Sequence, residues 1–209
     1  MQDGLLPLFP LQVVLLPGSP LPLHIFEDRY KEMIGEVLRD KREFGVVLAS
    51  EKGIVNTGCS ATVDRVLKEY PDGRLDILTR GRRRFEVLLL NDERSFLRGA
   101  VEFFDDDEGE PSQTAGPDLL KSVIEGFSEL QSLNSSDDPR LSFRLAQEVQ
   151  DLGLRQTLLA TRSESERMRR LADFLPAFLE RQKRVHRTKH VAGSNGHGHK
   201  PTDPTRDSS

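Results

Sequence analysis

The segment LLPLFPLQVVLLPGSPLPLHIFEDRY, from Leu5 to Tyr30, decides the fold class of this chain. Its first 22 residues, through Phe26, contain no Asp, Glu, Lys or Arg, which is long enough for a membrane-spanning helix. Five prolines interrupt it, however, and each proline costs about 3 kcal/mol inside a helix. We therefore predict two short strands, at 5–9 and 12–16, followed by a proline-rich loop, and no membrane segment.

Downstream of this loop the apolar residues take up helical spacing. A helix from about Glu27 to Asp40 is predicted because the following six residues fall on one face of it: Phe26, Tyr30, Met33, Ile34, Val37 and Leu38. Apolar and alternating runs then predict strands at 44–49, from 61 onward, and at 75–79, 84–90 and 96–104. The first part of the chain, residues 1–104, is therefore predicted to be mostly strands with one helix.

The composition changes abruptly at Asp105. The acidic run DDDEGEPS is typical of a solvated linker, to which we assign residues 105–116. Residues 117–185 are predicted to be helical, because apolar residues recur at helical spacing over 120–130, 141–152 and 168–179. The remaining residues, 186–209, have no apolar repeat and are predicted to form a disordered tail.

The overall composition limits the class of protein. The chain has 209 residues with 30 Lys and Arg against 34 Asp and Glu, a net charge of -4, which argues against a generally basic nucleic-acid binder. One cysteine, Cys59, cannot form an internal disulfide and is interpreted as a buried small hydrophobe. The first residues, MQDG, lack the positive charge of a secretory signal. We expect a cytoplasmic protein.

Sequence motifs of common enzymes are absent from the chain. It contains no G-x-x-x-x-G-K-[ST], no H-E-x-x-H and no G-x-S-x-G. A Ser-His-Asp relay would have to use His24, the only histidine before residue 186, and such histidines are more often structural. The four later histidines could bind a metal only if the tail became ordered. We therefore expect no enzyme, no catalytic residue, no metal and no cofactor.

The most basic cluster is Arg80-Gly81-Arg82-Arg83-Arg84. Guanidinium groups bind phosphate and carboxylate through two parallel hydrogen bonds, so Arg80, Arg82 and Arg83 are candidate ligands for an anion. Neighbouring strand residues point to opposite faces, which prevents all of them from serving one ligand. The alternative is a turn leading into a strand, with arginines that form ion pairs with the acidic runs.

Several motifs, taken together, resemble the N-terminal domain of Lon ATP-dependent proteases. The N-terminal ones are LPLFPL at 6–11, LPG at 16–18 and PLHIFEDRY at 22–30. The pattern continues with FGVVL at 44–48, Gly58, DGR at 72–74, GRRRF at 81–85, RQ-x-LL at 155–159 and ER at 166–167. The resemblance covers about residues 5–184 and implies an α+β fold, in which a PUA-like β-barrel is followed by a helical bundle.

The resemblance also implies a function. In Lon proteases this domain engages substrate polypeptides, and ATPase and peptidase modules follow it; neither module fits into a chain whose folded part is expected to end near residue 185. We therefore expect a free-standing, non-catalytic module that binds unfolded or specific polypeptides, as an adaptor in protein quality control. RNA binding through Arg80–Arg84 is the alternative, because PUA-like barrels include RNA readers, although the net charge argues against it.

The candidate polypeptide-binding surface is the segment Pro20–Tyr30, because an apolar loop fixed by prolines presents side chains at low entropic cost. The residues expected to contact a polypeptide are Leu23, His24, Ile25, Phe26, Arg29 and Tyr30. In the alternative interpretation Leu23, Ile25 and Phe26 plug one end of the barrel, and Glu27 and Arg29 form an internal ion pair. An exposed strand edge is a further way to bind an extended peptide.

Overall fold

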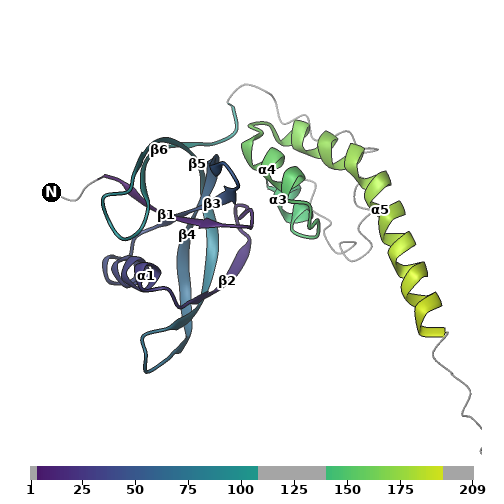
Figure 1. Ribbon diagram of the computed structural model, residues 1–209. Helices are drawn as coiled ribbons and strands as arrows, with labels where there is room; N and C mark the ends of the chain where they lie inside the picture. Colours follow the sequence, from purple (N-terminus) through teal and green to yellow (C-terminus); the bar gives the residue numbers. More distant parts are fainter. Residues whose placement is uncertain (1–3, 108–139, 195–209) are drawn as a thin grey trace, which may run out of the picture.

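The computed structural model describes residues 4–107 and 140–194 (Figure 1). The strands within these residues are β1 (Leu6–Leu11), β2 (Pro20–Ile25), β3 (Phe44–Ser50), β4 (Gly53–Glu69), β5 (Leu75–Asn91) and β6 (Arg98–Phe104). The helices are α1 (Asp28–Asp40), α3 (Leu141–Ala146), α4 (Leu152–Ala160) and α5 (Glu164–Ser194). The fold class is α+β, as predicted.

The strands pair in the order β2-β5-β4-β3-β1-β6, and β5 pairs with β6 in addition. Strands β1, β3, β4, β5 and β6 therefore follow one another in a closed cycle of pairings, in which only β1 and β3 are parallel. Strand β5 is long enough to pair with three strands, because residues 75–80 pair with β2, residues 84–91 pair with β6, and residues 75–86 pair with β4. Strand β2 lies outside the cycle as an edge strand.

Helix α1 packs on the core with most of the apolar face that its spacing predicts, but Phe26, predicted on the same face, precedes the helix and is exposed. Its residues Tyr30, Met33, Ile34 and Val37 are buried, and the helix ends at Lys41, which adopts a left-handed conformation. Each fully buried apolar side chain of this kind stabilises the folded state by about 1.5–3 kcal/mol. The predicted helix at 27–40 is therefore confirmed within one residue.

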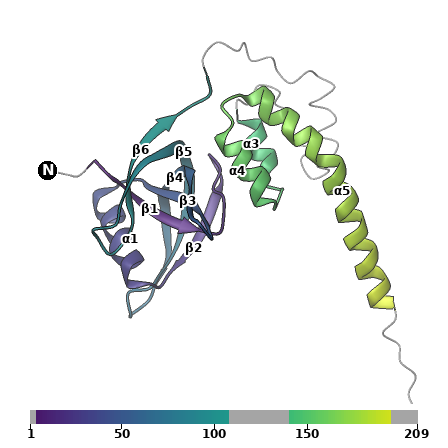
Figure 2. The ribbon, with the colours of Figure 1, turned by 45° about the horizontal axis from the view of Figure 1, so that its top comes forward.

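The strand half and the helical half share one hydrophobic core. Buried residues of both halves belong to one cluster, which includes Leu15 and Phe44 from the first half and Leu145 and Leu158 from the second. In Figures 1 and 2, α3 and α4 lie between the strands and α5. The side chain of Gln156 also donates a hydrogen bond from Nε2 to the carbonyl of Thr57, at 3.0 Å.

The proline-rich segment differs from the prediction. The strand predicted at 12–16 is absent, because β1 ends at Leu11 and residues 12–16 are not in a strand. The segment Pro20–Ile25, predicted as a loop, forms β2. Prolines cannot donate to a strand ladder, but an edge strand tolerates them where the missing N–H would point away from its partner. The runs 75–79 and 84–90 are likewise one continuous strand, β5.

The helical half also differs in two places. The helix predicted over 141–152 ends early, since α3 stops at Ala146. A second helix, α4, begins at Leu152, where the Asp151 carboxylate accepts a hydrogen bond from the Leu154 N–H at 2.8 Å and caps it. The predicted disordered tail is wrong for residues 186–194, which continue α5. That stretch contains no proline and no glycine before Gly193, so nothing interrupts the backbone hydrogen bonds. The helix predicted over 120–130, and most of the predicted linker, lie outside the described residues.

Candidate functional site

Edge strand β2 and the first half of β5 form an outward face that carries two of the predicted sites. The residues opposite each other on this face are Pro20 and Arg80, Pro22 and Leu78, and His24 and Asp76. The residues between them, such as Leu23 on β2 and Ile77 on β5, point to the core, as the alternation of burial along both strands shows. The free edge of β2 lacks N–H donors at both prolines, which disfavours generic addition of another strand.

An aromatic patch, made of His24, Phe26 and Tyr70, lies at one end of this face. The His24 ring stacks on Phe26 with centroids 5.8 Å apart and meets Tyr70 edge-on at 5.9 Å. Asp76 holds two of these rings, since its carboxylate lies 2.5 Å from His24 Nδ1 and accepts a hydrogen bond from the Tyr70 hydroxyl at 2.8 Å. The same hydrogen bonds, from His24 first and Tyr70 second, lower the pKa of Asp76. Phe26 is 58% exposed.

The predicted polypeptide contacts therefore divide into two groups. His24, Phe26 and Arg29 are on the surface, and Arg29 forms an exposed ion pair with its neighbour Glu27 at 2.6 Å. Ile25 and Tyr30 are core residues, 1% and 8% exposed, so their assignment as surface contacts is wrong.

The reason for this division is local geometry. Ile25 takes the inward position of β2, and Tyr30 lies on the buried face of α1, where its ring packs against Phe9 at 4.1 Å. Leu23 is half-buried and packs against the core from the same side as Ile25. The alternative of core packing therefore describes Leu23 and Ile25 better, but it is wrong for Phe26, which is exposed.

An arginine-lined hollow lies at the other end of the outward face. Gly81 makes it possible, because the loop before β2 crosses its backbone: Gly81 N–H donates to the Ser19 carbonyl at 3.0 Å and Gly18 N–H donates to the Gly81 carbonyl at 2.9 Å. A Cβ atom at Gly81 would lie 2.2 Å from the Leu16 carbonyl oxygen. The hollow has a volume of about 620 Å³ and is lined by Gly18, Glu43, Thr62, Arg80, Gly81, Arg82, Arg83 and Arg140.

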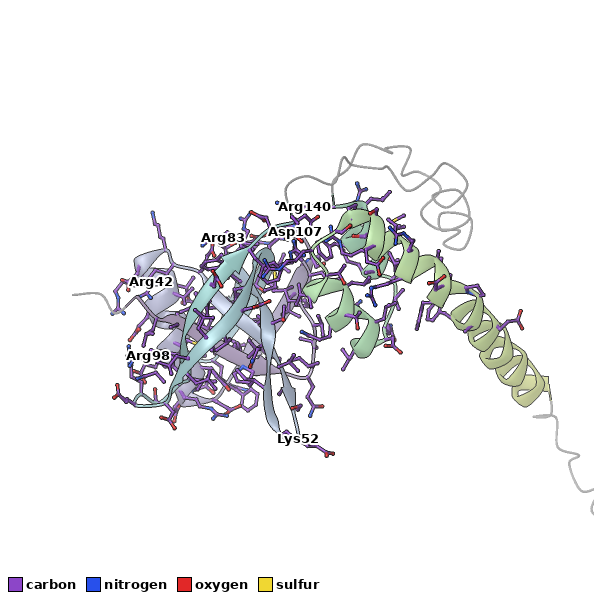
Figure 3. The ribbon with its side chains drawn as sticks, turned by 90° about the horizontal axis from the view of Figure 1, so that it is seen from above. Arg42, Lys52, Arg83, Arg98, Asp107 and Arg140 are labelled. Atoms are coloured by element: carbon purple, nitrogen blue, oxygen red, sulfur yellow. The ribbon has the colours of Figure 1, made fainter. Side chains whose placement is uncertain are left out.

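The three candidate arginines have different partners. They are the Asp64 carboxylate for Arg80 at 2.8 Å, the Glu43 carboxylate for Arg83 at 3.0 Å, and the Thr62 hydroxyl for Arg82 at 2.9 Å. The hollow receives side chains from both halves of the chain, as Arg83 and Arg140 illustrate (Figure 3). Arg80 and Arg83 are thus compensated by carboxylates, whereas the partner of Arg82 is neutral.

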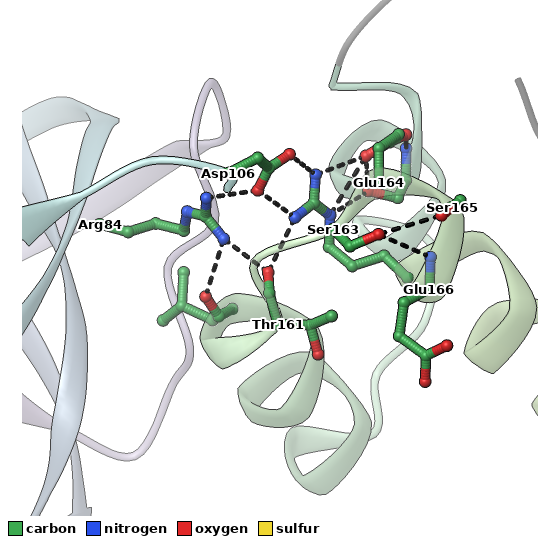
Figure 4. A network of polar contacts seen from close by, with 10 residues as sticks. Arg84, Asp106, Thr161, Ser163, Glu164, Ser165 and Glu166 are labelled. Carbon is green, nitrogen blue, oxygen red and sulfur yellow. Dashed lines mark hydrogen bonds and ion pairs between the residues drawn. The ribbon is translucent and has the colours of Figure 1, made fainter. Parts of the chain in front are cut away.

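The fourth arginine of the cluster, Arg84, has a structural position. It is buried, and it donates to Asp106 at 2.6 Å and to the carbonyl of Thr161 at 2.7 Å (Figure 4). Asp106 also receives Arg167 from α5. The predicted ion pair between the arginine cluster and the acidic run is therefore present at Arg84, and Asp106 is not a solvated linker residue. A sequence pattern offers no signal for this contact.

Three consecutive leucines form an exposed surface that the sequence interpretation missed. Leu88, Leu89 and Leu90 at the end of β5 are 65%, 66% and 47% exposed. The register shifts between Val87 and Leu89, so Leu88 is an extra residue in the strand and the alternation that buries every second side chain is lost there. Runs of three exposed apolar residues are unusual unless they serve contacts. We call these residues the leucine run.

Residues 4–107 and 140–194 contain neither a metal-binding cluster nor a membrane-spanning helix. This part of the chain holds no group of three or more His, Cys, Asp or Glu side chains arranged to bind a metal ion. None of the helices in the described ranges is long and apolar enough to cross a membrane.

Fold and surface together define an α+β domain whose exposed side chains form an aromatic patch, a leucine run and an arginine-lined hollow. Residues 5–184 match the family model described as the ATP-dependent protease La (LON) substrate-binding domain. The chain belongs to this family, which confirms the resemblance seen in the sequence motifs.

Relatives of known sequence are Lon proteases. The chain is 30% identical over 129 residues to Lon protease 1 of Hydrogenovibrio crunogenus and 29% identical over 127 residues to the Lon protease of Parabacteroides distasonis. These alignments cover 58% and 56% of this chain but only 16% and 15% of the two proteases. The similarity therefore concerns one part of those proteins.

Solved structures with the same fold cover most of the chain. A Lon N-terminal domain protein from Xanthomonas campestris is 29% identical, with a TM-score of 0.66 over 81% of this chain and 97% of that one. The N-terminal domain of the Mycobacterium avium complex Lon protease, 18% identical, shares the fold with a TM-score of 0.63 over 83% of this chain and 98% of that one.

Proposed function

We propose that this chain binds polypeptides without cleaving them, as a cytoplasmic adaptor in protein quality control. The observation that carries the proposal is the match of residues 5–184 to a family described as substrate-binding. In this proposal the closed cycle of strand pairings is the PUA-like barrel, and the helices after it form the bundle that positions the barrel surface. The arrangement supports recognition, because it fixes exposed apolar side chains on a rigid sheet.

The aromatic patch is the surface that we assign to polypeptide contact. Phe26 is largely exposed, yet its position is set by the stacked His24 ring and by the paired strand β2. An apolar side chain fixed in this way loses little conformational entropy when a partner covers it. Arg29, three positions after Phe26, is an exposed cation, and its guanidinium lies over the Tyr30 ring at 4.6 Å.

Binding of an unfolded protein tests the function. Fluorescently labelled, reduced and unfolded casein is titrated with the purified chain, and fluorescence anisotropy reports binding while gel electrophoresis reports cleavage. We expect saturable binding and intact casein, with or without ATP. Absence of binding, or ATP-dependent cleavage by clean protein, would overturn the proposal.

Point variants test the surface. We expect Phe26→Ser to weaken casein binding several-fold, because hot spots at interfaces are exposed aromatic anchors of this kind. Leu152→Ser removes an exposed apolar side chain from α4 and serves as the matched control. If Leu89→Ser weakens binding and Phe26→Ser does not, the leucine run replaces the aromatic patch as the contact surface.

RNA binding is the alternative function that the arginine-lined hollow favours. Two of its three candidate arginines, Arg80 and Arg83, already face carboxylates, which leaves few cations for phosphates. A labelled RNA oligonucleotide in the same anisotropy assay separates the functions. RNA binding that falls steeply between 50 and 200 mM salt, as counterion release requires, would support the alternative.

A further inference from the structure

The aromatic patch and the arginine-lined hollow lie on one continuous face of the sheet. Alternate residues of β5 point outward, and the outward set runs from Asp76, which holds the patch, through Leu78 and Arg80 to Arg82, which lines the hollow. The pairing of β2 with β5 has no register shift, and it extends to Arg80. Beyond it, the register between β4 and β5 shifts between Cys59 and Ala61, beside Arg82 and Arg83, and both of these side chains are exposed.

The length of this face matches a short extended peptide. Positions 76 to 82 are six residues apart on β5, which corresponds to about 20 Å at roughly 3.3 Å per residue. A polypeptide lying along the face in an extended conformation would therefore place side chains about six positions apart at the two ends. Between the ends it would pass the half-buried Leu78 and the exposed rings of Pro20 and Pro22.

The arginines of the hollow favour an acidic side chain at the end of the peptide that lies there. Four arginines and one carboxylate residue line the hollow, and two of the arginines pair with carboxylates, Arg80 with Asp64 and Arg83 with Glu43. Arg82 donates from Nε to the Thr62 hydroxyl, and its side chain makes no other hydrogen bond or ion pair with the residues that the structure describes. Its two terminal amino groups thus form a planar fork, the geometry that binds a carboxylate through two hydrogen bonds.

We propose that the outward face of β2 and β5 recognises polypeptides that carry an Asp or Glu about six residues from an aromatic or large apolar residue. The acidic side chain binds Arg82 in the hollow, and the apolar one packs on Phe26 and His24. This inference rests on the proposed polypeptide-binding function and adds a substrate preference to it. A single available guanidinium fork suits a side-chain carboxylate better than a chain of phosphates, and the net charge of -4 opposes a polyanion.

Matched synthetic peptides test the preference. The acidic peptide places one Asp six positions from one Phe in a Gly- and Ser-rich sequence, the amide peptide has Asn in place of Asp, and a third peptide shortens the spacing to three positions. We expect the acidic peptide to bind about two- to five-fold more tightly than the other two in anisotropy titrations at low salt, the range of a partly exposed ion pair.

Variants assign the preference to Arg82. Arg82→Gln should bind the acidic and amide peptides equally, whereas Arg39→Gln, which removes an exposed arginine from α1, should keep the preference. Arg82→Glu should reverse it in favour of a peptide with Lys in place of Asp, a gain that a misfolded variant would not produce.

The outcomes distinguish the two proposals. Equal binding of the acidic and amide peptides by the unmodified protein would overturn the acidic preference and leave the binding function intact. Failure of all peptides and of casein to bind would overturn the binding function itself. Binding of RNA, but of no peptide, with loss in Arg82→Gln would assign the hollow to phosphate and overturn both.

Discussion

Arg167 on α5 forms a two-pronged ion pair with Asp106, just beyond β6, with Nη1–Oδ1 and Nη2–Oδ2 distances of 2.6 Å. Arg167 is 1% exposed, and Arg84 from β5 shares the same carboxylate. One acidic side chain therefore joins three segments from both halves of the chain (Figure 4). It also holds the helical half in the position from which Arg140 lines the hollow.

Removing the Asp106 charge should destabilise the protein. Asp106→Asn leaves two buried guanidinium groups without their shared carboxylate, and we expect a loss of about 2 to 4 kcal/mol in the free energy of unfolding. Urea denaturation followed by circular dichroism measures it. The neighbouring Asp105 is exposed, so Asp105→Asn should change stability by less than about 0.5 kcal/mol. Equal effects of both substitutions would contradict the assignment of Asp106 as the junction.

The same carboxylate predicts a pH dependence. Burial alone would raise the pKa of Asp106, but the hydrogen bonds and charges of Arg167 and Arg84 outweigh it and hold the pKa below its usual value. A depressed folded-state pKa stabilises the fold above the unfolded value of about 3.9, and this contribution is lost as pH falls further. The stability difference between the unmodified protein and Asp106→Asn should be constant above about pH 5 and shrink below about pH 4. A difference that stays constant to pH 3 would argue against the ion pair.

Gly81 should not tolerate a side chain. A Cβ atom there would collide with the Leu16 carbonyl, which is backbone and cannot rotate away, so Gly81→Ala should cost about 1–3 kcal/mol and displace the loop at the hollow. Gly35 lies on the exposed face of α1 with open space around it. Gly35→Ala should stabilise the folded state by about 0.5–1 kcal/mol through helix propensity. Thermal denaturation of both variants gives the comparison, and a stabilised Gly81→Ala would show that the loop does not cross β5 there.

Truncation of two neighbouring residues at the end of β2 should lower the stability of the protein to very different extents. Ile25 is fully buried, and Ile25→Ala should cost about 2–5 kcal/mol by leaving a cavity. Phe26→Ala removes a mostly exposed ring and should cost less than about 1 kcal/mol while weakening polypeptide binding. Denaturation midpoints and casein titration provide both readouts. A stable Ile25→Ala protein would mean that β2 presents its other face to the core.

The single thiol should be unreactive in the folded protein. Burial, the largest effect, raises the pKa of Cys59 to about 12, so almost no reactive thiolate is present near neutral pH. A thiol-reactive chromophore at pH 8 should label the native protein only as fast as it opens, and the denatured protein at once. Comparable labelling rates in both states would place Cys59 at the surface.

Local patterns in the sequence were sufficient to predict the fold class, the family, helix α1 and several strands. Those features follow from periodic burial within a segment, as in the buried face that runs from Tyr30 to Val37 of α1. The three arginines predicted as candidate anion ligands, Arg80, Arg82 and Arg83, all line the hollow, and their binding of an anion stays a prediction. Of the residues predicted to contact a polypeptide, His24 and Phe26 are surface residues and Ile25 is not, while the contact itself stays a prediction.

Tertiary structure decided what depends on contacts between distant segments. Strand β2 forms only because its prolines can occupy the free edge of β5, more than fifty residues later in the chain. Arg84 became a buried junction residue, whereas Arg82, two positions earlier, stayed on the surface. Asp106 and Arg167 are 61 positions apart, and their charges become favourable only when the shared core brings the two halves together and removes water from the pair.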